Sequence, residues 1–191
     1  MKLFTAFLII FSATITFANT EGKSNISYSM AGLEAGFKWS SMDADSTGSD
    51  KQSMGYQIGA SGTFDIATNF AIKSGLFYNE RPFKVSDTIV VGTDITGKIT
   101  YFDIPVLLMF KFEEYAGVYL GPSLSIKMSD EISVGTLSNI KDTVVPLTIG
   151  GQFKFAPNLG VNVFFETVSG QLADGLKNSR AVGANLLVTF D

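Results

Sequence analysis

The chain has 191 residues, of which 46% are hydrophobic, 17% are charged and 13% are aromatic, with 14 Lys and Arg against 18 Asp and Glu. One folded domain is the default for this length, and the low, slightly acidic charge excludes a disordered or nucleic-acid-binding chain. The absence of Cys and His excludes a disulfide framework, a thiolate metal site and hydrolases built on a Ser–His pair. The composition therefore disfavours an enzyme.

The first 18 residues have the pattern of a secretory signal peptide. Lys2 gives a positive start, an apolar run covers residues 3–11, and Thr16 to Ala18 provide the small residues that a signal peptidase reads. A retained membrane anchor is the alternative, but the apolar run is shorter than the roughly 20 residues of a spanning helix. We expect cleavage after Ala18, a short periplasmic segment at 19–30 and one folded domain at 31–191.

Apolar and polar residues alternate with period two along the rest of the chain, in segments of about ten residues that are typical of membrane-spanning β-strands. In one of them, Ile104 and Val106 share a face while Asp103 and Lys111 lie on the other. No later stretch reaches the roughly 18 apolar residues of a membrane helix. The alternating segments cover 31–42, 54–65, 69–79, 99–112, 116–128, 144–155, 159–168 and 180–190.

The connections between these segments alternate in length. Tight turns are predicted at 65–68, 113–115 and 156–158, and long polar loops at 43–53, 80–98, 129–143 and 169–179. This pattern is typical of an outer-membrane barrel with periplasmic termini, which has an even number of strands, short turns at one end and long loops at the other. The sequence predicts an all-β fold, an eight-stranded antiparallel up-and-down transmembrane β-barrel.

The composition of the two faces predicts which one is outside. The apolar faces contain no Asp, Glu, Lys or Arg, and the opposite faces hold mainly Gly, Ser, Thr, Asn and Gln with few charges. A soluble barrel would carry a densely charged exterior, whereas small polar residues fit the cramped interior of a membrane barrel. We therefore expect the apolar faces to contact lipid. A soluble lipocalin-like carrier is the less favoured alternative.

Two of the segments also resemble motifs of a known family. They are YFDIPVLL at 101–108, with an aromatic-x-acidic-Ile-Pro pattern, and YLGPSLS at 119–125, with a Gly-Pro pair. Together with GLEAG at 32–36 and a last strand that ends in Phe190, they resemble the outer membrane protein beta-barrel domain family of PorT-like proteins over roughly residues 30–190. The resemblance implies an outer-membrane barrel and says little about activity. Val188 and Asp191 depart from the family's usual aromatic assembly signal.

Eight charged residues lie on faces predicted to point inward, and we expect them to form a structural polar network across the lumen. Asp103 and Glu166 are each expected to bond Lys side chains, because an unpaired buried carboxylate is costly. Five Lys against three carboxylates would give the interior a charge of +2, so a narrow pore for water, ions or very small solutes is the alternative. The eight residues are Glu34, Lys38, Lys73, Asp103, Lys111, Lys127, Lys154 and Glu166.

No catalytic, cofactor-binding or metal site is predicted. A carboxylate pair among Glu34, Asp103 and Glu166 could in principle perform acid-base chemistry, but enzymes of similar barrel form generally rely on His, which this chain lacks. The loop 43–53 begins with the oxygen spacing of a calcium loop, yet Met54 stands where such a loop has its bidentate Glu. We expect a flexible acidic loop there and leave cation binding open.

Two of the long loops contain β-branched and other apolar residues. This content favours strands that continue above the bilayer as a projecting sheet with exposed edges, which can pair with a partner. The hypothesis is a monomeric, non-enzymatic barrel in outer-membrane lipid that is structural or adhesin-like, with loops 80–98 and 129–143 as its surface. Solvated loops without a specific function are the alternative. The apolar residues are Val85, Ile89, Val90 and Val91 in the first loop, and Ile132, Val134, Leu137 and Ile140 in the second.

Overall fold

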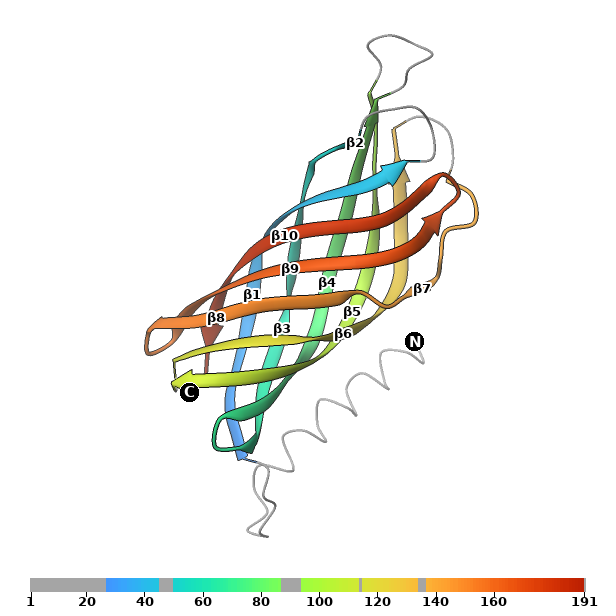
Figure 1. Ribbon diagram of the computed structural model, residues 1–191. Coiled ribbons are helices and arrows are strands. Elements are labelled where there is room, and N and C mark those ends of the chain that lie inside the picture. The colour runs from blue at the N-terminus through green and yellow to red at the C-terminus, as the bar shows by residue number, and fades with distance from the viewer. Residues whose placement is uncertain (1–26, 45–49, 87–93, 114, 134–136, 191) are drawn as a thin grey trace, which may run out of the picture.

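Long antiparallel strands make up the molecule in the computed structural model, which describes residues 27–44, 50–86, 94–113, 115–133 and 137–190 (Figure 1). Eight of the strands in this part of the chain have ten residues or more, and β2 and β7 have two each. The strands are β1 (Ser27–Ala44), β2 (Asp50–Lys51), β3 (Ser53–Ala67), β4 (Phe70–Ser86), β5 (Asp94–Glu113), β6 (Ala116–Ile132), β7 (Thr143–Val144), β8 (Leu147–Ala156), β9 (Leu159–Ala173) and β10 (Leu176–Thr189).

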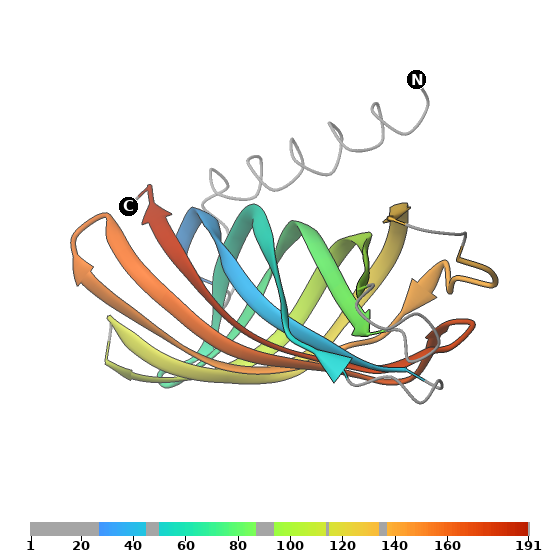
Figure 2. The ribbon, with the colours of Figure 1, turned by 90° about the horizontal axis from the view of Figure 1, so that it is seen from above.

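The long strands pair in chain order and close into a ring. β4 pairs with β3 and β5, and the ring closes where β1 pairs with β10, with Leu33 opposite Val188. The short strands β2 and β7 pair with β4 and β6, just ahead of β3 and β8 in the chain. Figure 2 shows the tilted strands curving round so that β1 and β10 lie side by side. The predicted eight-stranded antiparallel up-and-down barrel is confirmed.

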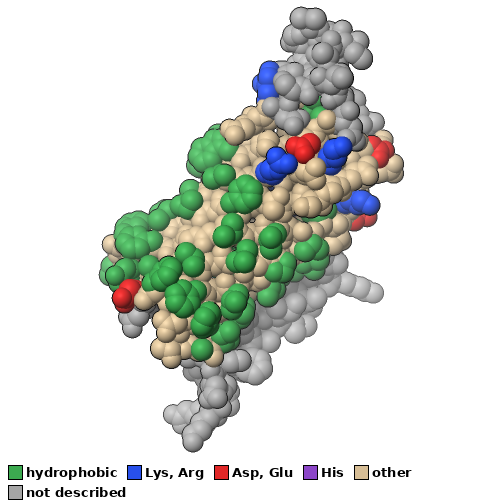
Figure 3. Space-filling model, in the orientation of Figure 1, with side chains coloured by type: hydrophobic (Ala, Val, Ile, Leu, Met, Phe, Trp, Pro, Cys, Tyr) green, Lys and Arg blue, Asp and Glu red, His purple; other side chains and the backbone are tan. Residues whose placement is uncertain are grey.

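The outward side chains are apolar and exposed, while the inward ones are mostly polar and buried. Val106, Val163 and Val182 point outward and are about half exposed, whereas Glu34 and Lys73 are buried. Figure 3 shows hydrophobic side chains over the lower and middle parts of the visible face, with charged side chains gathered toward the upper end. This is the polarity of a barrel surrounded by lipid, and it is opposite to that of a lipocalin-like carrier.

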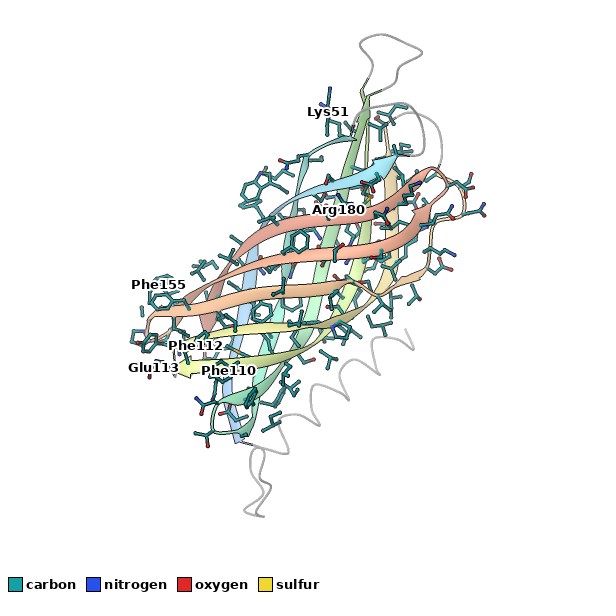
Figure 4. All side chains as sticks on the ribbon, in the orientation of Figure 1. Lys51, Phe110, Phe112, Glu113, Phe155 and Arg180 are labelled. Carbon is teal, nitrogen blue, oxygen red and sulfur yellow. The ribbon has the colours of Figure 1, made fainter. Side chains whose placement is uncertain are left out.

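The two ends of the barrel differ in their connections. The inner end has the tight turns after Ala67, Glu113 and Ala156, as the sequence predicts. It is rich in aromatic side chains: the Phe110 ring lies 5.1 Å from that of Phe112, measured between centroids. Figure 4 places Phe112, Glu113 and Phe155 at this inner end and Lys51 and Arg180 toward the opposite one, the outer end.

The strands extend further toward the outer end than predicted. β1 begins at Ser27 instead of 31, which lengthens it at the inner end, where Ser27 pairs with Asp65. At the outer end, β4 continues to Ser86 and β5 begins at Asp94, so much of the predicted loop 80–98 is paired strand. In the same way β6 continues to Ile132 into the predicted loop 129–143. Charged and Pro-containing stretches were interpreted as loops, but cross-strand pairing holds them extended. Within the described residues, no helix is long and apolar enough to cross a membrane.

The predicted long loop 169–179 is instead the end of a β-hairpin. β9 runs to Ala173 and β10 starts at Leu176, which leaves a two-residue turn of Asp174 and Gly175. Gly175 has a φ of +77°, a left-handed conformation that glycine adopts readily. An Asp-Gly pair between alternating segments is a strong hairpin signal, so this turn was readable from the sequence.

Candidate functional site

The inner ion-pair cluster is centred on Glu34 of β1 and Lys73 of β4. Lys73 Nζ lies 2.7 Å from Glu34 Oε1, and both side chains are almost completely buried. Glu34 also accepts hydrogen bonds from Ser61 Oγ (2.6 Å) and Asn162 Nδ2 (2.7 Å), and Lys73 donates one to Gln152 Oε1 (2.6 Å). Each buried charge thus has an opposite charge and further polar partners, which is what makes its burial tolerable.

The outer ion-pair cluster joins Lys38, Arg81, Asp103 and Glu166, which come from β1, β4, β5 and β9. Arg81 Nη2 lies 3.0 Å from Asp103 Oδ2, and Arg81 Nε lies 3.1 Å from Glu166 Oε1. Lys38 Nζ is 3.3 Å from the same Glu166 oxygen, and Asn79 donates a hydrogen bond of 2.5 Å to Asp103. A single guanidinium therefore bridges two carboxylates across the lumen, as its fork of N–H donors allows.

Arg81 is the functional residue that the sequence analysis missed. It falls in the predicted loop 80–98, but β4 runs through it and keeps the alternation that turns Lys73 and Asn79 inward. The prediction that Asp103 bonds a Lys is wrong, because its cationic partner is Arg81; Glu166 bonds Lys38 as well as Arg81. The two clusters together contain the buried ions Lys38, Lys73 and Arg81 with Glu34, Asp103 and Glu166. Three cations thus balance three carboxylates, and the expected charge of +2 is wrong.

The other three predicted interior lysines lie toward the barrel rims. Lys111 Nζ pairs with Asp65 at 2.6 Å and Lys127 Nζ with Asp130 at 2.8 Å, and in both pairs the side chains are partly exposed. Lys154 is half-buried near the end of β8. Their positions near strand ends let the long aliphatic stems carry the ammonium groups toward water. The structure therefore does not bring them together with the two clusters.

Side chains fill the lumen between and around the two clusters. A cavity of about 40 Å³ lies where residues of both clusters meet, with Lys73, Tyr119 and Phe164 among its walls. That volume holds only a few water molecules, since one needs about 10 to 15 Å³ on this measure. The arrangement fits the expectation that eight strands enclose a lumen just wide enough for side chains.

An apolar core fills the outer end of the barrel. Phe83, Ile99 and Leu172 are buried in it, drawn from β4, β5 and β9. Ile132, Leu137 and Ile140 of the predicted loop 129–143 pack against this core instead of lining an exposed edge, and Val85 is buried within it. Ile89, Val90, Val91 and Val134 lie outside the described residues. The buried members of this outer-end core are Met42, Phe83, Val85, Ile99, Tyr101, Val144, Val168, Leu172, Ala173 and Leu176.

Charged residues surround the outer-end core on its outer face. Lys98 Nζ lies 2.9 Å from Glu80 and 3.5 Å from Glu131, which links β5 to β4 and β6. The hydrogen bond to Glu80 raises the pKa of the Lys98 ammonium above its ordinary value. Across the barrel, Arg180 Nη2 lies 3.7 Å from Asp43. The outer end thus has the apolar-inside, polar-outside arrangement of a water-soluble sheet.

The described residues include no group of three or more Asp and Glu placed to hold a metal ion. Asp43, the first residue of the predicted acidic loop 43–53, accepts a hydrogen bond of 3.0 Å from Asn178. Residues 45–49 of that loop lie outside the described residues. The carboxylates of Glu34, Asp103 and Glu166 are each held by cations and amides, as given above.

Comparison with known proteins agrees with this architecture. The family model described as "Outer membrane protein beta-barrel domain" matches residues 17–178. The chain belongs to this family. It is accordingly an outer-membrane protein, and its lipid-facing belt and polar lumen are those of a membrane-embedded barrel. No curated protein sequence matches the chain.

Solved structures with the same fold include two bacterial proteins. The attachment invasion locus protein Ail of Yersinia pestis, in complex with the heparin analogue sucrose octasulfate, superposes with a TM-score of 0.51 at 15% identity, over 84% of this chain and 98% of Ail. Neisserial surface protein A superposes with a TM-score of 0.50 at 17% identity, over 89% of this chain and all of that protein (100%). At these identities the similarity concerns the fold alone.

Proposed function

We propose that this outer-membrane barrel is a monomeric, non-enzymatic surface-interaction protein that acts through its outer end. The observation that carries the proposal is the length of the strands at that end. β4, β5 and β6 have 17, 20 and 17 residues, whereas about 9 to 11 residues suffice to cross a bilayer. At about 3.3 Å per residue, the excess lifts a three-stranded sheet well above the membrane.

The outer-end core supports this role because spanning the bilayer does not require it. Phe83, Ile99 and Leu172 pack inside the raised part of the barrel and hold its strands in place. A rigid projecting sheet loses little conformational entropy when a partner binds. The polar outer face, with the exposed Glu131 and the partly exposed Lys98 beside the buried Glu80, is the part presented to the cell exterior.

The filled lumen argues against the alternative of a narrow pore. The outer-end core lies across one end of the lumen, and the paired charges of the two clusters occupy its middle. Both would have to rearrange before a solute could pass.

A polyanion such as the heparin analogue in the Ail complex is a poor fit for this outer end. Lys141, Lys177 and Arg180 are exposed there, but so are several acids. The exposed cations are thus interspersed with carboxylates, and the whole chain has a net charge of −4. Such a surface favours a partner that it recognises by complementary shape and by charges of both signs. The exposed acids of the outer end are Asp130, Glu131, Asp142 and Asp174.

The proposal is tested with cells that display the protein and are applied to immobilised extracellular-matrix proteins and glycans. One variant joins Ser86 to Asp94 through an Asn-Gly turn, and a second carries Asp130→Asn with Glu131→Gln. Glu113→Gln at the inner end is the matched control. The surface-interaction role is supported if native and control cells are retained on at least one of these surfaces and cells with either outer-end variant are not.

Equal retention of all four cell types, or of none, would contradict a surface-interaction role. Single-channel recording in planar bilayers separates the alternative, because a steady current from the native protein would point to a pore. A shift in gel mobility between unboiled and boiled samples confirms that each variant forms its barrel.

A further inference from the structure

Carboxylates of both ion-pair clusters line the same cavity in the middle of the lumen. Its volume is about 40 Å³, and Glu34, Asp103, Glu166 and Asn185 are among its walls. Each of these four residues is at most 5% exposed. The cavity is therefore lined by buried polar side chains together with apolar ones such as Leu107 and Phe164.

Four polar atoms in or beside this cavity have no partner among the described residues. Two of them, Asp103 Oδ1 and Asn185 Oδ1, belong to residues of the cavity wall. The other two, Asn79 Oδ1 and Arg81 Nη1, belong to residues that hydrogen-bond Asp103 Oδ2. Buried polar atoms without a partner are rare and costly in folded proteins, so the two oxygens that belong to the cavity wall, Asp103 Oδ1 and Asn185 Oδ1, call for an occupant of the cavity.

The chemistry of the four atoms identifies the occupant. Three are oxygen acceptors and one is a guanidinium donor. A water molecule both donates and accepts, so a few waters can satisfy all four atoms. A monovalent cation would satisfy only the oxygens, and it would lie near Arg81 in a lumen whose carboxylates are already balanced by cations.

We propose that the cavity is a binding site for two or three ordered water molecules that join the inner and outer ion-pair clusters into one hydrogen-bonded network. The volume agrees with this number, since each water needs about 10 to 15 Å³. The outer-end core separates these waters from the cell exterior. They are structural waters that exchange slowly, and they are not part of a conducting file.

The test uses solid-state NMR of the labelled full chain in lipid bilayers, with magnetisation transfer from water to the Asn185 side-chain amide as the readout. Ser123, a buried residue of the cavity wall, provides the variants. Ser123→Leu extends an apolar side chain into the cavity, while Ser123→Ala removes the hydroxyl and leaves the space open. The backbone amide of Val163, whose side chain faces lipid, supplies the background.

In the native protein and in Ser123→Ala, we expect magnetisation transfer to Asn185 to lie well above the Val163 background. In Ser123→Leu we expect it to fall to that background. Background transfer in the native protein overturns the proposal even if Ser123→Leu does not fold. Persistent transfer in a folded Ser123→Leu overturns it too. A shift of the Asp103 carboxyl signal when choline replaces sodium in the buffer would instead identify a bound cation and overturn the water assignment.

Discussion

The middle of the barrel and its outer end have opposite polarity, although the same strands build both. Along β4, inward positions change from Lys73, Asn79 and Arg81 to Phe83 and Val85. On β1 they change from Glu34 and Lys38 to Met42, and on β9 from Asn162 and Glu166 to Val168 and Leu172.

The outward positions change at the same level and in the opposite sense. On β4, Leu76 and Tyr78 are followed by Glu80 and Lys84, and on β10 the outward row that contains Val182 continues upward to Arg180. The environment explains the exchange: lipid favours apolar groups outside and leaves polar groups to pair inside, whereas water favours the reverse. We therefore expect the barrel to leave the bilayer at the level of this exchange, just above Arg81.

The largest effect is expected from Arg81→Met in the polar middle. It leaves Asp103 and Glu166 buried with only Lys38 to balance them, and breaking a buried ion pair from one side costs about 3 to 5 kcal/mol. Urea unfolding in lipid vesicles, followed by the fluorescence of Trp39, the single Trp of the chain, measures the loss. A change below about 1 kcal/mol, the usual value of an exposed pair, would mean that this cluster is not the main support of the lumen.

Leu172→Ala tests the apolar outer end. Leu172 is completely buried in the outer-end core, and truncation of such a side chain costs about 2 to 5 kcal/mol through lost burial and the cavity left behind. The loss should have the same size in detergent and in bilayers, because this core lies outside the membrane. Vesicle and micelle unfolding curves that disagree on the size of the loss would place the core within the bilayer instead.

Val163→Arg tests the lipid-facing belt. Val163 points outward from β9 and is about half exposed, so the substitution should weaken folding into bilayers by about 2 to 4 kcal/mol if the site is near the midplane. Ile104→Arg should act in the same way. Gln57→Arg, at the wall of the lumen cavity, should act through crowding instead. Equal tolerance of all three substitutions in vesicle-folding titrations would contradict the assignment of inside and outside.

Arg180→Ala should have the smallest effect. The Arg180 side chain is 58% exposed, and its closest atom lies 3.7 Å from Asp43, so the pair contributes at most about 1 kcal/mol. The same urea titration measures it. A loss as large as that of Arg81→Met would show that the outer end does not behave as a water-exposed surface.

The fold was predictable because its main signal is local. Side chains on a strand alternate with period two, so a lipid-facing row such as Val106 and Leu108 and a lumen-facing residue such as Asp103 can be identified without knowing any partner. The tight turn after Ala156 and the closed, even-numbered ring followed from the same pattern. The same alternation would have found Arg81, had the charged run around Pro82 not been interpreted as a loop.

The sequence by itself determined the barrel, its lipid-facing surface and most residues of the polar lumen, because these depend on periodicity along a single strand. Only the tertiary structure decided which charges pair. Lys38 and Glu166 are 128 positions apart in the chain, and their meeting depends on the register of every strand between them around the closed ring. The packing of Ile132 and Ile140 onto the outer-end core is decided in the same way, since local hydrophobicity cannot show whether an apolar loop residue has a core to cover.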